Sequence, residues 1–268
     1  MFDNTCKFLA ENFPSNFATW LLGEEITLTK LSPKELSVEP IRADALILLQ
    51  SDELVLHIEF QTQPDHKIPF RMADYRLRAY RRFPQKRMRQ VVIYLCRTDS
   101  ELVHETSFTL EETFHRFQVI RLWEQPTEIF LHTPGLLPFA VLSNTNSQTS
   151  TLQEVAAQIE NISDRNVQNN VTASAALLAG LVLEEEVIKR LLRRDIMRES
   201  VIYQSIKAEG REEGREEGRE EGIEEGVRRV AVNLLKDGMS TEVVVRATGL
   251  TVEQVRQLQS TQVETQGE

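Results

Sequence analysis

The fold is decided by Arg42-Ala-Asp44-Ala-Leu-Ile-Leu-Leu49 and, after a short polar turn, by Val55-Leu-His-Ile-Glu59-Phe-Gln61-Thr-Gln63. Both halves are apolar and rich in Ile, Leu and Val, which predicts two strands of a β-hairpin. With a turn at Ser51-Asp52, Asp44 would lie opposite Glu59 and Arg42 opposite Gln61. Directly opposed side chains share one face of a sheet, with Cβ atoms roughly 4.5–5.5 Å apart. The hairpin therefore predicts two carboxylates held side by side.

Two carboxylates in that arrangement repel each other unless a cation lies between them. Mg²⁺ prefers an octahedron of oxygens and usually takes one or two protein carboxylates together with water and phosphate oxygens. Asp44 and Glu59 are thus candidate metal ligands, and the backbone carbonyl of Phe60 is a further one. Because side chains alternate along a strand, Gln61 is predicted to lie on the same face as Glu59, while Phe60 points into the core.

The same residues also allow an ordinary structural interpretation. Paired acids on a solvated sheet face need no metal if Arg42 or His57 balances their charge. Upstream of the hairpin, Glu35 and Glu39 are candidates for an accessory acidic position, although the pattern favours a surface role for either. Spacing alone leaves the metal site and the solvated face as alternatives.

A longer motif extends beyond the hairpin. The motif comprises Glu59-Phe60-Gln61, Gln63-Pro64-Asp65, Pro69-Phe70-Arg71-Met72 and Tyr75. Asp44 lies about fifteen residues before its start. This motif resembles the recombination-promoting nuclease/transposase family, within the PD-(D/E)xK or restriction-endonuclease-like superfamily. The resemblance covers residues 1–145 and implies a restriction-endonuclease-like mixed sheet. It also implies phosphodiester cleavage in DNA that depends on Mg²⁺ (or Mn²⁺/Ca²⁺), with Asp44 and Glu59 as ligands.

Gln61 stands where most of that superfamily carries lysine. A lysine would supply positive charge beside the attacking water, whereas a glutamine can orient the water but cannot offset charge. The electrostatic work would then shift to the metal, and Arg42 would be placed to supply the missing charge. An Arg42→Ala variant with full cleavage would exclude that role for Arg42.

The order of elements predicts an α/β fold. Helices are expected over 3–22, over 69–83 and over much of 151–207, and a further helix is expected to begin within 134–142. Strands are expected over 41–49, 54–62, 90–96 and 117–123. A strand, a helix and a second strand in succession imply a crossover and a parallel pair, so the sheet is predicted to be mixed. The polar stretch 143–150 is predicted to be a linker. Four parts follow: a nuclease-like domain at 1–145, a helical extension at 151–207, a charged Gly-x-x-x-Gly helix or linker at 208–227, and a small helix-turn-helix-like unit at 228–260.

Charge is unevenly placed along the 268 residues, whose net charge is −10. Residues 207–225 carry nine glutamates, whereas residues 71–89 carry eight basic residues and one acid. Such a basic stretch suits contacts to DNA phosphates, for which Arg71, Tyr75, Arg78 and Arg82 are the candidates. The alternatives are a solvated helix face and, for Tyr75, a role in packing.

The pattern of the C-terminal quarter of the chain favours assembly into a homo-oligomer. Glycine recurs every four residues from Gly210 to Gly226, which favours a helix that self-associates along its bare stripe, with a charged linker as the alternative. Beyond it, helices ending at Gly238 and Gly249 precede the capping box Thr251-Val-Glu-Gln254 and a last helix. This unit is a weak DNA-binding candidate because its final helix has few basic residues, so a homo-oligomer is the favoured role.

Composition narrows the class of protein. Two cysteines, Cys6 and Cys96, form no disulfide framework, and no signal peptide pattern opens the chain. The longest apolar run, 173–183, is too short to span a bilayer, so a cytoplasmic protein without a membrane segment is expected. Three functions remain open: a metal-dependent DNA endonuclease, a catalytically silent DNA-binding or transposase-accessory protein, and an oligomeric helical adaptor.

Overall fold

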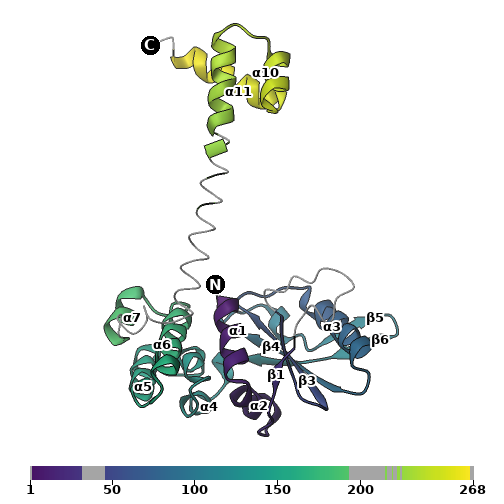
Figure 1. Cartoon of the computed structure of the whole chain (residues 1–268), viewed down its shortest axis with the longest axis vertical. Coiled ribbons are helices and arrows are strands. Elements are labelled where there is room, and N and C mark those ends of the chain that lie inside the picture. Colours follow the sequence, from purple (N-terminus) through teal and green to yellow (C-terminus); the bar gives the residue numbers. More distant parts are fainter. Residues whose placement is uncertain are drawn as a thin grey trace. The chain divides into compact units, whose positions relative to one another are not determined.

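The computed structural model describes residues 2–31, 46–192, 215, 219, 222–223 and 225–265. The chain divides into two compact units, Met1–Ile206 and Lys207–Glu268 (Figure 1). Most of the glycine repeat between residues 210 and 226 lies outside the described residues, so its helical or linker character stays a prediction.

A five-stranded mixed sheet forms the centre of the first unit. Its strand order is β1-β2-β3-β4-β7, with β1 at Thr29–Lys30, β2 at Leu46–Gln50, β3 at Leu54–Gln61, β4 at Arg87–Tyr94 and β7 at Gln118–Arg121. Strands β2 and β3 are antiparallel, whereas β3–β4 and β4–β7 are parallel. Helix α3 at Ile68–Arg82 makes the crossover between β3 and β4. The predicted α/β class and its parallel pair are confirmed.

The predicted hairpin register is wrong. Leu46 lies opposite Glu59 and Gln50 opposite Val55, so Asp44 is not the partner of Glu59. The turn consists of Asp52-Glu53 because Ser51 closes it: the Ser51 amide donates to the Leu54 carbonyl at 2.9 Å and the Ser51 hydroxyl accepts from the Leu54 amide at 3.2 Å. Serine is favoured at the first position of a turn for this reason.

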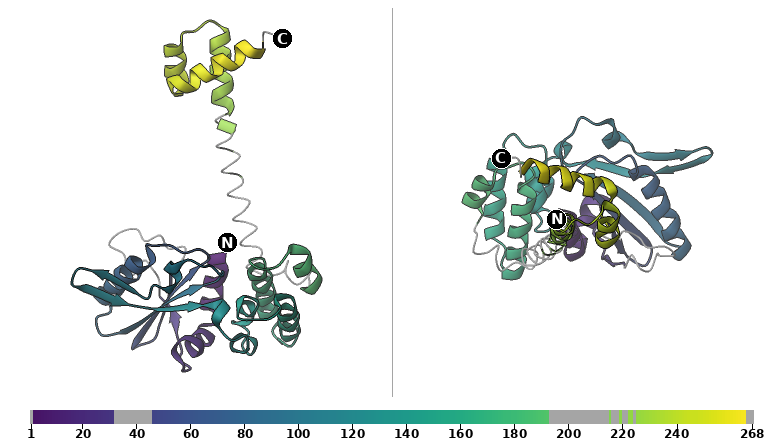
Figure 2. Two further views of the ribbon diagram at one scale, coloured as in Figure 1. Left: turned by 180° about the vertical axis from the view of Figure 1, so that it is seen from behind. Right: turned by 90° about the horizontal axis from the view of Figure 1, so that it is seen from above.

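One face of the sheet carries the main apolar core. Leu56, Ile58 and Phe60 of β3 pack there against helices α1 (Phe2–Asn12), α2 (Pro14–Leu22), η4 (Leu137–Leu142), α5 (Gln148–Glu160) and α6 (Arg165–Ala179). The Phe60 ring stacks on Phe139, with centroids 5.6 Å apart. Helix α1 contacts both β2 and α6, so the residues after 148 share the core of the sheet (Figure 2).

Two helical predictions on this face need correction. The expected helix over 3–22 is two helices, because Pro14 starts α2 at a position where a missing amide costs no hydrogen bond. Residues 137–142 form a buried 3-10 helix, preceded by a short helix α4 at Glu128–Leu131. The last described helix of this unit, α7, spans Glu185–Leu191.

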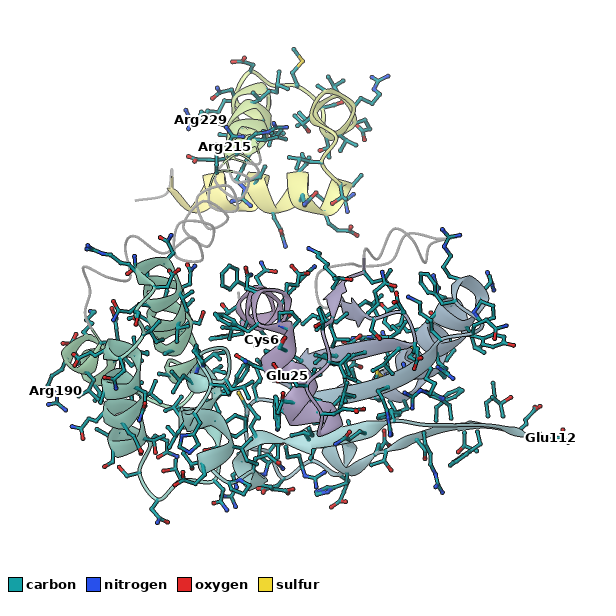
Figure 3. All side chains as sticks on the ribbon, turned by 60° about the horizontal axis from the view of Figure 1, so that its bottom comes forward. Cys6, Glu25, Glu112, Arg190, Arg215 and Arg229 are labelled. Carbon is teal, nitrogen blue, oxygen red and sulfur yellow. The ribbon has the colours of Figure 1, made fainter. Side chains whose placement is uncertain are left out.

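Both cysteines are free, as expected. Cys6 is fully buried in α1 (Figure 3), and burial raises the pKa of its thiol well above the usual range. Cys96 is half-buried, and burial likewise raises its pKa. Neither thiol is therefore readily ionised, and both act as small packing residues.

The opposite face of the sheet is covered by α3 and by a two-stranded hairpin, β5 (Ser107–Leu110) and β6 (Thr113–Arg116). The rings of Phe108 and of Phe70 in α3 meet in a T-shaped arrangement, with centroids 5.6 Å apart. Short 3-10 helices precede and follow the hairpin region, η2 at Glu101–His104 and η3 at Leu122–Glu124. Two small apolar clusters on this face comprise Leu31, Leu48, Val55 and Tyr75, and Ile68, Met72, Val92, Tyr94, Val103 and Phe117.

A tight approach near Gly135 gives a stability prediction. A Cβ at this position would lie inside van der Waals contact of the Phe13 side chain and of Asn16 Oδ1, which accepts a hydrogen bond from the Gly135 amide at 3.1 Å. Gly135→Ala is therefore expected to destabilise the protein by about 1–3 kcal/mol. Thermal unfolding checks this, with Gly226→Ala as the control because a Cβ there meets nothing within 4 Å. Equal melting temperatures for Gly135→Ala and the parent would contradict the prediction.

The second unit is a small helical body. A helix over 225–236, α10 at Thr241–Thr248 and α11 at Val252–Thr265 surround a core of Ala231, Val244 and Val255. Gly238 and Gly249 adopt positive φ angles of 81° and 73° at the helix ends, which glycine allows without strain. The predicted capping box is confirmed, because the Thr251 amide donates to Gln254 Oε1 at 2.8 Å and the Gln254 amide donates to Thr251 Oγ1 at 3.2 Å.

Among the described residues, none of the helices combines the length and the apolar character that a membrane crossing requires.

Candidate active site

Glu59 is a buried carboxylate near the end of β3, on the face covered by α3. Its side chain is 1% exposed. Three polar groups approach it at long distances: the Gln61 amide nitrogen lies 3.4 Å from Oε2, an Arg71 nitrogen lies 3.7 Å from Oε2, and His57 Nε2 lies 3.5 Å from Oε1. A buried charge is costly unless it is paired or coordinates a metal. The loosely contacted Glu59 carboxylate therefore has capacity for a further cationic partner.

Arg71 places positive charge beside this carboxylate. One of its terminal nitrogens donates to Asp65 Oδ2 at 2.9 Å, while the other approaches Glu59. Asp65 is itself fixed by the start of α3, since its Oδ1 accepts from the Lys67 amide at 2.9 Å. The motif predicted from sequence thus brings Glu59, Gln61 and Arg71 together.

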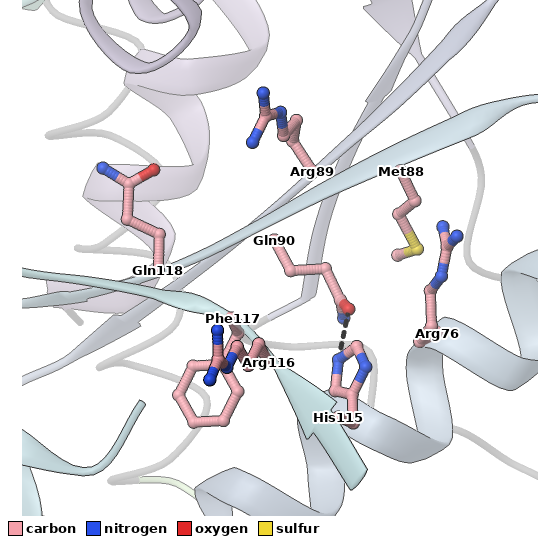
Figure 4. Close-up of a pocket in the computed structure, with 8 residues that line it drawn as sticks. All are labelled: Arg76, Met88, Arg89, Gln90, His115, Arg116, Phe117 and Gln118. Carbon is pink, nitrogen blue, oxygen red and sulfur yellow. Dashed lines mark hydrogen bonds between the residues drawn. The ribbon is translucent and has the colours of Figure 1, made fainter. Parts of the chain in front are cut away.

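A chain of side chains leads away from Glu59 along the same face of the sheet. His57 Nδ1 lies 3.0 Å from Gln90 Nε2, which also donates to the Met72 carbonyl at 2.8 Å. Gln90 Oε1 lies 2.8 Å from His115 Nε2 (Figure 4). His57 is fully buried, and its Nε2 makes no hydrogen bond within the described part of the chain. A buried polar atom without a hydrogen-bond partner costs about 1–3 kcal/mol, so a partner for His57 Nε2 would stabilise the site.

The outer end of the chain opens into a pocket of about 580 Å³. Its lining comes from α3, β4, β6 and β7 and comprises Arg76, Met88, Arg89, Gln90, His115, Arg116, Phe117 and Gln118 (Figure 4). Burial lowers the pKa of His115, and the nearby Arg76 and His57 lower it further. These effects favour the neutral imidazole, and the hydrogen bond from His115 Nε2 to the amide oxygen of Gln90 needs only one ring proton.

The other residues predicted for DNA contact differ in their surroundings. Tyr75 is 7% exposed, and its ring meets His57 edge-on with centroids 5.2 Å apart. Burial raises the pKa of Tyr75, and the charge of Glu59 adds to this effect. Arg78 donates to both Asp74 oxygens at 2.9 and 3.0 Å. Arg82 is exposed, with its guanidinium carbon 6.0 Å from the Phe83 ring centroid.

The remaining predicted residues, Arg42, Asp44, Glu35 and Glu39, lie outside the described residues. Within the described ranges, no group of three His, Cys, Asp or Glu side chains is placed to hold a metal ion. The chemistry of Glu59 fits Mg²⁺, because its carboxylate offers the oxygen ligands that this ion prefers. Glu59 alone is insufficient, so the fit depends on a second carboxylate.

Asp3 is a site neighbour that sequence reasoning missed. It lies in the first turn of α1, where burial raises its pKa and the negative charge of Glu59 raises it further. The N-terminal amino group lowers the same pKa, and its effect is larger than that of Glu59. The only signal in the sequence is an acid at the start of an amphipathic helix, which is common at helix N-termini for other reasons.

Comparison with known proteins adds one match, to the C-terminal unit. Residues 224–260 match the family model described as the Rpn/YhgA-like nuclease family, C-terminal HTH domain. Neither the curated proteins nor the solved structures give a match. The matched residues contain the helix over 225–236, α10, the Gly249 turn and the first half of α11. This match supports the family predicted from the motif around Glu59: residues 224–260 match the C-terminal helix-turn-helix domain of the Rpn/YhgA-like nuclease family.

Proposed function

We propose that this protein is a metal-dependent DNA endonuclease with a restriction-endonuclease-like core. The observation that carries the proposal is the buried Glu59 carboxylate, whose contacts to Gln61, Arg71 and His57 are all between 3.4 and 3.7 Å among the described residues. A helix-turn-helix domain of a nuclease family in the same chain supports it.

Each side chain has a role in this proposal. Glu59 and Asp44, with the Phe60 carbonyl, would hold Mg²⁺, or Mn²⁺ or Ca²⁺ in its place. The bound ion would supply Lewis-acid activation of water and stabilise charge on the phosphate. Gln61 would orient the attacking water through its amide. Arg71 would offset the negative charge that develops on the phosphate, the part that lysine would take at position 61.

Cleavage of supercoiled plasmid by the purified protein tests the proposal. Nicking is expected with Mg²⁺ and not after chelation with EDTA. A folded protein that binds DNA but does not cleave it with Mg²⁺, Mn²⁺ or Ca²⁺ would instead support a catalytically silent DNA-binding or transposase-accessory protein. Gln61 in place of lysine is the observation that favours this second candidate.

We propose that Arg82 of α3 contacts DNA. Arg82 has no acidic partner among the described residues, whereas Arg78 is neutralised by Asp74. Arg82→Gln is therefore expected to weaken binding about equally for all DNA sequences and to reduce the slope of log affinity against log salt by about one. Fluorescence anisotropy at several salt concentrations measures this. The same slope for Arg82→Gln and the parent would exclude a phosphate contact at this position.

The role proposed for the C-terminal unit is assembly into a homo-oligomer. On the exposed start of α11, one arginine, Arg256, is accompanied by one glutamate, Glu253, a poor charge balance for entering a major groove. The helix-turn-helix match keeps DNA contact as the alternative. The mass of the purified protein in solution, with and without residues 208–268, separates the two.

A further inference from the structure

The orientation of the Gln90 side-chain amide is fixed by a backbone group. The Met72 carbonyl can only accept a hydrogen bond, so the atom of Gln90 that lies 2.8 Å from it must be the amide nitrogen. The opposite side of the amide then presents its oxygen to His115 Nε2 at 2.8 Å. The main chain of α3 thus sets the direction of the whole chain of hydrogen bonds.

This direction determines which nitrogen of each histidine carries a proton. The second hydrogen of the Gln90 amide nitrogen points to His57 Nδ1 at 3.0 Å, so Nδ1 is the acceptor and Nε2 carries the proton. On the other side, His115 Nε2 donates to the Gln90 oxygen. His57 therefore presents an N–H group to Glu59 Oε1, 3.5 Å away.

The surroundings of His57 and Glu59 are closed to solvent. His57 and Glu59 are 0% and 1% exposed and Gln90 is 6% exposed. They lie between the two apolar clusters of the α3 face, which contain Val55 and Tyr75 on one side and Met72 and Val92 on the other. A polar group enclosed in this way depends on neighbouring protein groups for its hydrogen bonds. The orphaned Nε2–H of His57 is thus left with Glu59 as its available partner.

We propose that Gln90 is a positioning residue for Glu59: it holds His57 with its proton on Nε2, and that N–H directs Glu59 Oε2 toward Gln61 and Arg71. The proposal rests on the proposed function, since it assigns Glu59 as the ligand being oriented. The contact of 3.5 Å would shorten when the site is loaded, as active-site hydrogen bonds are commonly long in the free protein. Gln90 itself touches neither substrate nor metal in this arrangement.

The test compares Gln90→Met with the full-length parent. Methionine fills a similar volume but removes both hydrogen bonds to the histidines. Groups that orient a metal ligand typically contribute 10–100-fold to metal affinity or activity. Gln90→Met is therefore expected to lower kcat for plasmid nicking and the affinity for Mn²⁺ by about 10–100-fold, with KM for DNA unchanged. Gln118→Met is the matched control, because Gln118 lines the same pocket but is exposed and makes no side-chain hydrogen bond within the described residues.

Nitrogen NMR of histidine in the parent protein keeps the proposal falsifiable even if Gln90→Met does not fold. A signal for His57 protonated on Nε2 alone, assigned by its loss in His57→Gln, supports the proposal. Protonation of His57 on Nδ1 would overturn it, as would unchanged kcat and Mn²⁺ affinity in a folded Gln90→Met. The tautomer and the Mn²⁺ affinity are measured without cleavage, so a parent that fails to cut DNA counts against the proposed function alone.

Discussion

Replacing Glu59 by glutamine is expected to lower the rate of Mg²⁺-dependent DNA cleavage by about 10³-fold or more. A metal ion contributes several kcal/mol of charge stabilisation to the transition state, and each 1.36 kcal/mol corresponds to a factor of ten in rate. Glutamine is nearly isosteric with glutamate and keeps an oxygen, but it lacks the charge that holds the ion. Single-turnover nicking of supercoiled plasmid measures the effect.

Glu53→Gln is the matched control for this experiment, because Glu53 lies in the turn of the same hairpin and is exposed. The free energy of unfolding of Glu59→Gln should not fall, since Arg71 keeps its ion pair with Asp65 and a buried charge is removed. Asp44→Asn is expected to give a comparable loss of cleavage, because both carboxylates would hold one ion. Cleavage by Glu59→Gln within tenfold of the parent would place the active site elsewhere.

Replacing Arg71 by glutamine is expected to lower kcat by about 10²-fold, the loss typical of removing one group that stabilises transition-state charge. Arg71 contacts Glu59 from α3, whereas Gln61 can orient water but brings no charge. If Arg71 supplies the charge that lysine would bring, then adding Gln61→Lys to Arg71→Gln should restore part of the lost rate. Arg190→Gln on α7, exposed and without an ion pair among the described residues, controls for a change in net charge.

A double variant as slow as Arg71→Gln alone would show that position matters more than charge at this site. An Arg71→Gln variant with the kcat of the parent would remove Arg71 from the mechanism. In that case the ion pair with Asp65, at 2.9 Å, would be a local anchor for the start of α3.

The sequence predicted the architecture better than it predicted the pairing of residues. The apolar strands and the intervening α3 were sufficient to predict a mixed sheet with β3 and β4 parallel, because a crossover allows no other direction. The register of β2 on β3 was not predictable in the same way, since it depends on the Ser51 hydroxyl closing the turn one residue later than expected. Apolar alternation alone tolerates both turns.

The β5–β6 hairpin was missed for a related reason. Its loop is Glu111-Glu112, with Glu112 at the projecting tip (Figure 3). Glu111 adopts a φ of 51°, a conformation that glycine, asparagine or aspartate usually provides in such turns. The local sequence therefore carries no turn signal, and the hairpin is joined to the rest of the unit by contacts such as that of Phe108 with Phe70 and that of His115 with Gln90.

The contacts of the candidate site differ in the same way in how far the sequence predicts them. Glu59, Gln61 and Arg71 belong to one continuous motif, and their side chains lie together in the structure. The contact of His57 with Gln90 depends instead on the pairing of β3 with β4, in which these two residues are direct partners. The influence of Glu59 on the pKa of Asp3 likewise depends on where α1 packs in the folded unit. Contacts that arise from strand pairing and helix packing cannot be derived from local spacing.

The Met72 carbonyl has a consequence for how this protein can change during evolution. Because the acceptor that fixes Gln90 belongs to the main chain of α3, no substitution at position 72 deletes it. The Met72 side chain, fully buried beside Val92, remains free to vary among apolar residues that fill the same space. Positions 57, 90 and 115 are constrained instead, because only a few side chains can donate and accept hydrogen bonds there in the required order.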